Sequence, residues 1–248
     1  MGVLTKAAIL CGGKGNRLRP LTNYFQKTMI PVGSRRRPML EYVVRLMVHN
    51  GVKDMVMLCG YRSDEITNYF GDGSRFEANV RYCSDRPDTA GSAPALANAI
   101  KTNTFGTYDY LLLYYGDVLS TLEVRALLKQ HESHRADLTL VLSNNYAVPV
   151  GIADVTRGRV SAFREKPNLG LKVTTGCMVI AKSCVPILYD AVNDGGTDMM
   201  SHFVPAVLKE KMNVRPYYLR GFWYDVGTTE AYEKLDDETV ERHLRFLG

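Results

Sequence analysis

Short apolar runs alternate with segments of helical periodicity over the first 143 residues. The apolar runs predict strands at residues 6–11, 55–59, 80–82, 110–115 and 138–142. Between them, apolar residues recur three and four positions apart, which predicts helices at 38–50, 63–70, 92–101 and 122–131. Strands that alternate with helices are typical of a doubly wound α/β fold with a mostly parallel sheet.

The pattern changes after residue 143. Turns separate three further predicted strands, at 151–156, 160–164 and 173–181. Few helices are predicted between them, so we expect a mixed, partly antiparallel extension of the sheet. A last segment, 228–246, predicts one closing helix that Thr228 caps. Because no linker rich in proline, glycine or serine divides the chain, we expect a single α/β domain over residues 1–248 with one shared core.

Charge and cysteine content narrow the function classes. The 31 Lys and Arg residues outnumber the 26 Asp and Glu residues, for a net charge of +5, which suits a protein that handles anions. The basic residues form no long block, so we expect no nucleic-acid partner. The 5 cysteines show no CxxC spacing, which argues against a zinc knuckle or a disulfide framework and favours a reducing compartment.

Membrane and export signals are weak. No stretch approaches the ~20 apolar residues of a membrane span, and the first residues lack the charged-then-apolar order of a signal peptide. We therefore expect a cytoplasmic protein with no membrane partner. The composition leaves a homo-oligomer open.

A glycine-rich loop follows the first predicted strand and runs Leu10-Cys11-Gly12-Gly13-Lys14-Gly15-Asn16-Arg17-Leu18. Glycines let the backbone approach a ligand closely, and successive N–H groups then bind an anion. The dinucleotide fingerprint fails because Leu18 stands where its third glycine belongs, and the P-loop fails because Gly15 follows Lys14. The loop is therefore predicted to bind phosphate without belonging to either class.

Two carboxylates are candidates for a metal site. In open α/β sheets, ligands bind outside the carboxyl ends of the strands, so we expect the site after Cys11 and after Tyr115. Asp117 lies at the second of these positions, and a carboxylate beside a buried strand is costly unless it binds something. Asp225 follows an aromatic run and precedes a predicted helix. Mg²⁺ takes one or two carboxylates plus substrate phosphates, which fits this pair.

Six ordered segments carry a resemblance to a known family. They are the run from Gly12 to Thr22 (GGxGxRLxPLT) with Lys27 and Pro31-Val32 after it, Pro38-Met39-Leu40-Glu41-Tyr42, Asp88-Thr89-Ala90-Gly91, Tyr115-Gly116-Asp117-Val118, Phe163-Arg164-Glu165-Lys166-Pro167 and Trp223-Tyr224-Asp225-Val226-Gly227-Thr228. Each alone is weak, but together and in this order they resemble the sugar-1-phosphate nucleotidyltransferases. This family includes mannose-1-phosphate guanylyltransferases and glucose-1-phosphate thymidylyl-, uridylyl- and cytidylyltransferases.

The resemblance implies one Rossmann-like catalytic domain and a set of substrates. It implies a nucleotide-binding half at about 1–143, a sugar-phosphate-binding half at about 144–227 and a closing helix at 228–248. A nucleoside triphosphate and a sugar 1-phosphate would react, with Mg²⁺ as cofactor, to give a nucleoside diphosphate sugar and pyrophosphate.

Residue roles follow from the same resemblance. Arg17 would neutralise the departing pyrophosphate, Lys27 would bridge the phosphates of both substrates, Lys166 would hold the sugar phosphate and Glu165 would accept from sugar hydroxyls. The implied catalytic set is Arg17, Lys27, Asp117, Lys166 and Asp225, of which Asp117 and Asp225 hold the metal. The implied nucleotide-binding set is Leu10, Gly12, Gly13, Lys14, Gly15, Asn16, Arg17, Asp85, Gly91, Ser92 and Gly116. The implied sugar-phosphate-binding set is Gly151, Glu165, Lys166, Thr174, Thr175 and Gly176.

The nucleobase segment, residues 84–92, favours guanine over other bases. It lacks the glutamine that thymidylyl and uridylyl members often use, and Asp85 there could accept from guanine or cytosine donors. The expectation is therefore GTP with mannose 1-phosphate, with the glucose-1-phosphate thymidylyl-, uridylyl- and cytidylyltransferases as alternatives.

Three positions depart from the family pattern. Gln26 replaces the usual proline before Lys27, Asn16 replaces threonine or serine, and Cys11 replaces alanine. We expect Gln26 to loosen the approach to Lys27. These departures leave open a catalytically degenerate regulatory subunit that binds nucleotide sugars without turnover. A nicotinamide oxidoreductase is a third class, which the missing third glycine argues against.

Overall fold

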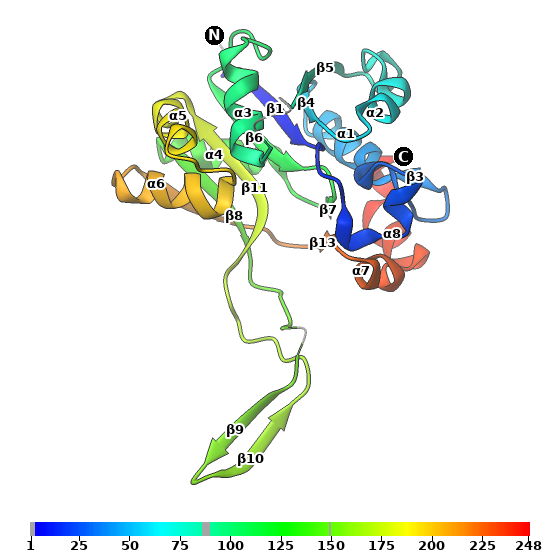
Figure 1. The fold of residues 1–248 in the computed structure, drawn as a ribbon, viewed down its shortest axis with the longest axis vertical. Helices are drawn as coiled ribbons and strands as arrows, with labels where there is room; N and C mark the ends of the chain where they lie inside the picture. Colours follow the sequence, from blue (N-terminus) through cyan, green and yellow to red (C-terminus); the bar gives the residue numbers. More distant parts are fainter. Residues whose placement is uncertain (1–2, 86–89, 149) are drawn as a thin grey trace.

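A mixed sheet forms the centre of the protein (Figure 1). The computed structural model describes residues 3–85, 90–148 and 150–248. The strands of this sheet are β1 (Thr5–Leu10), β4 (Asp54–Cys59), β5 (Asn79–Ser84), β6 (Tyr110–Tyr115), β8 (Leu138–Ser143), β11 (Val173–Ala181) and β12 (Val214–Tyr218). They lie in the order β12-β8-β11-β6-β1-β4-β5, and every neighbouring pair is parallel except the two that β11 makes.

Helices cover both faces of the sheet. One face packs against α1 (Met39–His49), α2 (Ser63–Phe70), α4 (Val124–Ser133) and α8 (Asp237–Leu244). The other packs against α3 (Ser92–Lys101), α5 (Val185–Asn193) and α6 (Val204–Lys209). Successive residues of a strand point to opposite faces, so Ile9 enters one core and Ala8 the other. The predicted doubly wound α/β fold with a mostly parallel, mixed sheet is confirmed.

The first half of the chain follows the predicted elements closely. Helix α1 shows why: its apolar residues face the sheet, and it ends where Gly51 adopts a positive φ of 85°. This left-handed conformation is strained for residues with a Cβ and terminates many helices.

The sequence pattern did not predict α5 and α6 in the second half of the chain. Helix α5 buries only Leu188 fully, and α6 buries only Val204 and Val207, so neither helix has a broad buried face. Strand β12 contains Pro216, which argues against a strand inside a sheet. The residue is tolerated because β12 lies at the edge.

The single closing helix predicted at 228–246 is wrong. Thr228 caps a first helix, α7 (Thr229–Lys234), by accepting a hydrogen bond from Ala231 N–H at 3.1 Å. Leu235 then adopts extended backbone, and Asp236 starts α8 by accepting from Thr239 N–H at 2.6 Å. An aspartate cap inside a charged run is what divides this segment.

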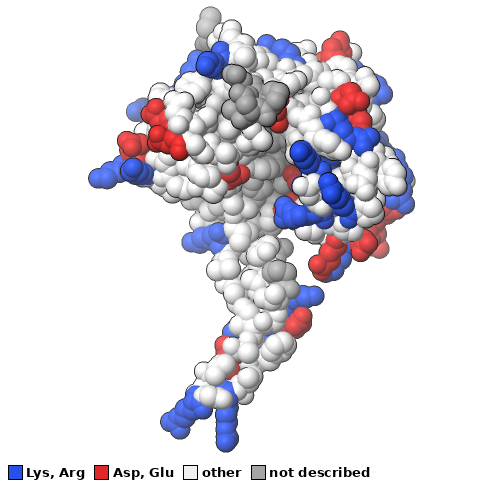
Figure 2. Space-filling view, viewed as in Figure 1, with Lys and Arg blue, Asp and Glu red and all other residues white. Residues whose placement is uncertain are grey.

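Strands β9 (Ile152–Thr156) and β10 (Arg159–Arg164) form a separate hairpin, which we call the arm. It projects away from the sheet and its helices (Figure 1). Its tip carries Arg157 and Arg159 and shows as a basic end in Figure 2. The expectation of one shared core is wrong for this segment, because Val155 and Phe163 are each 65% exposed.

All five cysteines are free and buried in the structure. Across residues 3–85, 90–148 and 150–248, no helix combines the length and the apolar character that crossing a membrane requires.

His131 gives the fold a pH dependence that can be measured. It is fully buried on α4, where its Nδ1 lies 2.8 Å from the hydroxyl of Thr139, and burial lowers its pKa to about 4. Unfolding returns the pKa of His131 to about 6.5. Below that pH, His131 therefore binds a proton in the unfolded chain but stays neutral in the folded chain until the pH approaches its lowered pKa. We expect this group to cost about 2 kcal/mol of stability between pH 7 and pH 5.

Urea unfolding of wild type and His131→Gln at pH 7 and pH 5 measures this difference. The variant should lose about 2 kcal/mol less than wild type over that interval. Equal losses in the two proteins would show that His131 does not titrate as its burial requires.

Candidate active site

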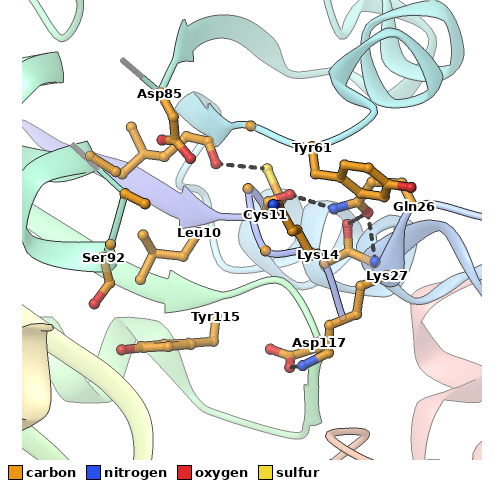
Figure 3. Close-up of a pocket in the computed structure, with 18 of the residues that line it drawn as sticks. Leu10, Cys11, Lys14, Gln26, Lys27, Tyr61, Asp85, Ser92, Tyr115 and Asp117 are labelled. Atoms are coloured by element: carbon orange, nitrogen blue, oxygen red, sulfur yellow. Dashed lines mark hydrogen bonds and ion pairs between the residues drawn. The ribbon is translucent and has the colours of Figure 1, made fainter. Parts of the chain in front are cut away.

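A cavity of about 600 Å³ opens at the carboxyl ends of β1 and β6 (Figure 3). From β1 the chain builds β4 and β5 on one side and then returns to β6 on the other. Such a reversal of strand order leaves a crevice between the two strands, where ligands bind in open α/β sheets. The cavity is lined by Leu10, Cys11, Gly12, Gly13, Lys14, Gln26, Lys27, Thr28, Leu58, Gly60, Tyr61, Ser84, Asp85, Ala90, Gly91, Ser92, Ala95, Tyr115 and Asp117.

The glycine-rich loop is shaped by close contacts. Gly15 has a φ of 64°, and a Cβ there would lie 2.7 Å from the Thr22 methyl group and 3.0 Å from Cβ of Lys27. The Thr22 hydroxyl also donates to the Gly15 carbonyl at 3.0 Å. The absence of a side chain at Gly15 therefore lets the stem of Lys27 pack directly against the loop.

Gln26 holds the loop and the Lys27 turn together. Its side-chain amide donates to the carbonyl of Cys11, and its Oε1 accepts from Thr28 N–H at 2.6 Å and from the Thr28 hydroxyl at 2.7 Å. Its backbone N–H donates to the carboxylate of Glu65 at 2.7 Å. Gln26 is fully buried. The expectation that Gln26 loosens the approach to Lys27 is therefore wrong, because its amide bridges two segments.

Lys27 and Asp117 form an ion pair across the cavity (Figure 3). Their side chains are only 15% and 13% exposed, so water screens the pair weakly. Lys27 lies in the short turn Lys27–Met29 that Gln26 caps, and Asp117 lies just after β6. The pair therefore joins the loops that follow the two central strands.

A second carboxylate, Asp225, lies beside Asp117 although it comes from near the other end of the chain. Strand β13 (Trp223–Asp225) pairs antiparallel with β7 (Val118–Ser120), which sets Asp225 opposite Val118. The N–H of Val226 donates to the carbonyl of Asp117 at 3.1 Å. Asp117 and Asp225, which lie 225 − 117 = 108 positions apart in the sequence, thus become neighbours through backbone pairing.

Charges around Asp225 act on its ionisation. Burial raises the pKa of Asp225, and the negative charge of Asp117 raises it further, while Lys27 and Arg17 lower it. A Cβ on Gly227 would lie 3.1 Å from Oδ1 of Asp225 and 3.6 Å from a guanidinium nitrogen of Arg17. Arg17, Lys27, Asp117 and Asp225 therefore form one cluster of two cations and two carboxylates, which we call the charge cluster.

The donor set of the charge cluster fits Mg²⁺. Mg²⁺ keeps several waters and binds one or two carboxylates together with substrate phosphates, so Asp117 and Asp225 supply what it needs from the protein. In the part of the chain that the structure describes, no group of three or more His, Cys, Asp or Glu residues is placed to bind a metal by itself.

Asp85 lies at the other end of the cavity, over the glycine-rich loop. A Cβ on Gly12 would lie 2.5 Å from Oδ2 of Asp85 and 3.1 Å from the backbone nitrogen of Gly60, so glycine is needed for this approach. Burial raises the pKa of Asp85. Tyr61 also lines the cavity and was not predicted from the sequence, although Gly60-Tyr61 follows β4 just as the glycine-rich loop follows β1.

Some residues of the implied nucleotide set have structural contacts. The hydroxyl of Ser92 donates to Asp198 at 3.1 Å and accepts from Met199 N–H at 2.9 Å. Gly91 approaches the carbonyl of Thr197 so closely that a Cβ would collide with it. Gly116 lies against the Leu10 carbonyl, where its Cβ would be 3.1 Å away. Asp88 and Thr89 of the implied base loop lie outside the described residues.

The structure does not bring the implied sugar-phosphate residues into the cavity. Gly151, Glu165 and Lys166 lie at the base of the arm, where Glu165 and Lys166 are 4.0 Å apart and more than half exposed. The pKa of Glu230 on α7 is lowered chiefly by its hydrogen bond with Lys234 and to a smaller extent by the charge of Lys166.

The Thr174-Thr175-Gly176 segment of β11 faces in two directions. Thr175 is buried and its hydroxyl donates to the carbonyl of Val141 at 3.0 Å, so this side chain is used inside the fold. Thr174 donates to the sulfur of Met200 at 3.7 Å. Gly176 lies under the ring of Tyr115, which lines the cavity.

Comparison with known proteins identifies the family. The model of the nucleotidyl transferase family matches residues 6–242. The chain belongs to the nucleotidyl transferase family. The match runs from β1 to α8 and so includes all four residues of the charge cluster.

Individual relatives of this chain are distant in sequence. A probable mannose-1-phosphate guanylyltransferase 2 of Oryza sativa subsp. japonica is 29% identical over 234 residues, which cover 92% of this chain and 62% of the relative. A UTP–glucose-1-phosphate uridylyltransferase of Synechocystis sp. is 26% identical over 262 residues, which cover 97% of this chain and 64% of the relative. The chain thus spans less than two thirds of the length of these relatives.

A solved structure supports the fold of this chain. The crystal structure of a candidate glucose-1-phosphate thymidylyltransferase from Bacillus anthracis, in complex with a sucrose, superposes with a TM-score of 0.75. The two chains are 20% identical, and the superposition covers 95% of each.

Replacement of Gln26 tests its bridging role. Gln26→Ala leaves the Cys11 carbonyl and both Thr28 donors without their partner and opens a cavity, so we expect a loss of about 3 kcal/mol of unfolding free energy. The only other glutamine, Gln130, donates a single hydrogen bond to the Pro216 carbonyl at 2.9 Å near the surface. Gln130→Ala is the matched control, with an expected loss below about 1 kcal/mol. Equal losses by denaturant unfolding would contradict the bridge.

Proposed function

We propose that the chain is a sugar-1-phosphate nucleotidyltransferase. It joins a sugar 1-phosphate to the α-phosphorus of a nucleoside triphosphate and releases pyrophosphate. The observation that carries this proposal is the charge cluster, which lies beside the glycine-rich loop at the switch point of the sheet. The family match supports the class of reaction.

The reaction requires positioning more than acid–base chemistry. A phosphate monoester has a second pKa near 6, so the attacking sugar phosphate is already ionised at pH 7 and needs no general base. The thiol of Cys11 is a poor nucleophile, because its pKa is raised well above the ordinary value, chiefly by burial. Direct in-line attack by the sugar phosphate on the α-phosphorus therefore fits the groups around the cavity.

Each residue of the charge cluster has a part in this step. The backbone N–H groups of residues 12–15 and the side chain of Lys14 bind the triphosphate, and Arg17 neutralises the pyrophosphate as it leaves. Lys27 donates to the phosphates of both substrates. With Mg²⁺ held by Asp117 and Asp225, the site gains a Lewis acid that polarises the α-phosphate.

GTP and mannose 1-phosphate are the proposed substrate pair. Asp85 carries two acceptor oxygens over Gly12 and Gly60, and the Watson–Crick edge of guanine offers two donors, N1–H and the N2 amino group. The rice relative named above, a probable mannose-1-phosphate guanylyltransferase, supports this choice. The Synechocystis relative, a UTP–glucose-1-phosphate uridylyltransferase, keeps UTP with glucose 1-phosphate as the alternative pair.

Pyrophosphate release over a matrix of substrates tests the proposal. The matrix combines GTP, UTP, dTTP and CTP with mannose 1-phosphate and glucose 1-phosphate, in the presence of Mg²⁺. GTP with mannose 1-phosphate should give the highest kcat/KM. Asp117→Asn should lower kcat by about 100-fold or more, because a ligand and charge of the transition state are lost.

Asp109→Asn is the matched control for this variant. Asp109 is exposed at the opposite end of β6, where it accepts from Leu4 N–H at 2.8 Å, so its replacement should leave kcat within about twofold. Binding of nucleotide without turnover of any pair would contradict the proposal and favour a regulatory subunit. Full activity of Asp117→Asn would contradict the role of the charge cluster.

A further inference from the structure

Lys27 occupies the place on Asp117 that a metal ion would take. Its ammonium group contacts Oδ2 of Asp117, and both side chains are largely shielded from water. Asp225 lies beside this pair, and Arg17 lies beside Asp225. Two cations and two carboxylates cancel, so the empty charge cluster has no excess negative charge to attract a divalent cation.

The backbone of Lys27 is fixed while the end of its side chain can move. Gln26 caps the turn that contains Lys27. Gly15 packs so closely against the stem of Lys27 that a Cβ on Gly15 would lie 3.0 Å from Cβ and 3.2 Å from Cγ of Lys27. Beyond that point the ammonium group sits on a flexible stem. The ammonium group can therefore exchange Asp117 for another anion in the same cavity without any change in the fold.

We propose that Lys27 acts as a substitute cation on Asp117 in the empty site, and that the phosphates of the nucleotide draw it away. The carboxylates of Asp117 and Asp225 then become free to bind a divalent cation only when a nucleotide is present. This inference rests on the proposed function, which supplies the polyphosphate ligand.

Charge balance explains the order of binding. A free divalent cation would have to displace an ammonium group from its carboxylate and remain next to Arg17. A triphosphate brings several negative charges, so Lys27 and Arg17 can pair with phosphate oxygens while the carboxylates turn to the metal. By linkage, metal and nucleotide must each raise the affinity of the site for the other.

Mn²⁺ titrations followed by electron paramagnetic resonance test the inference without nucleotide and without turnover. Lys27→Met removes the substitute cation and keeps the apolar stem, so its affinity for Mn²⁺ should exceed that of wild type by at least about tenfold. Lys14→Met is the matched control, since Lys14 lines the same cavity and no ion pair of it is found among the described residues. Its affinity for Mn²⁺ should change by less than about threefold.

GTP binding in EDTA provides the second measurement. Lys27→Met should weaken this metal-free binding by about tenfold, because Lys27 is the group that pairs with the phosphates. The same substitution thus strengthens metal binding and weakens nucleotide binding. A merely structural role of Lys27 would weaken both, since a distorted site loses both ligands.

Three results would overturn the inference: no gain in Mn²⁺ affinity for Lys27→Met, an equal gain for Lys14→Met, or a gain that persists when Asp117→Asn is added. Different results would contradict the proposed function and the inference. Absence of turnover over the whole substrate matrix, together with the opposite shifts for Lys27→Met, would contradict the proposed function alone. Turnover together with unchanged Mn²⁺ affinity would contradict the inference alone.

Discussion

The ion pair between Lys27 and Asp117 joins the two sides of the proposed site while the site is empty. Each partner follows one of two neighbouring parallel strands, β1 and β6, at the point where the strand order reverses. A site that joins two polyanions has to offset strong like-charge repulsion, and opposite charge near the phosphates does so. The rest of the structure places this charge: Gln26 fixes the turn of Lys27, and the pairing of β13 with β7 delivers Asp225.

The two proposed substrates would depend on different parts of the chain. The proposed nucleotide end lies on the glycine-rich loop and on the ends of central strands, which the packed core holds in place. The implied sugar-phosphate residues Glu165 and Lys166 lie at the base of the arm, outside that core. Pairing of Val155 with Val160 gives the arm one apolar face, and the ion pair of Asp154 with Arg164 lies on the other. The proposed nucleotide end therefore lies on the packed core, whereas the implied sugar end lies on a separate element.

Much of the fold could be predicted from local pattern. Strand β6 is a continuous apolar run, and α1 has an amphipathic face and a glycine just after it, so both were found. Strand β12 was missed, because an edge strand tolerates a proline that an internal strand does not. The arm was placed in the core, because period-2 apolar residues do not reveal whether anything packs against them.

The candidate site was predictable where a motif fixes the backbone and not where side chains meet across the fold. The positions of Asp117 and the glycine-rich loop follow from their places at strand ends. The bridge by Gln26 depends on the carbonyl of Cys11 and the turn at Thr28, which only the tertiary structure brings together. Replacement of a usual proline by glutamine therefore looked like a loss in the sequence, although the side chain makes new hydrogen bonds.

We propose that opposite charge positions the two polyanions for one direct displacement at the α-phosphorus. The most direct measurement is the stereochemical outcome with a nucleoside triphosphate that carries sulfur at a defined position on the α-phosphorus. A single in-line attack predicts a nucleotide sugar with inverted configuration at that phosphorus. Retention of configuration would mean that a side chain of the protein carries the nucleotide in between, which would contradict the account.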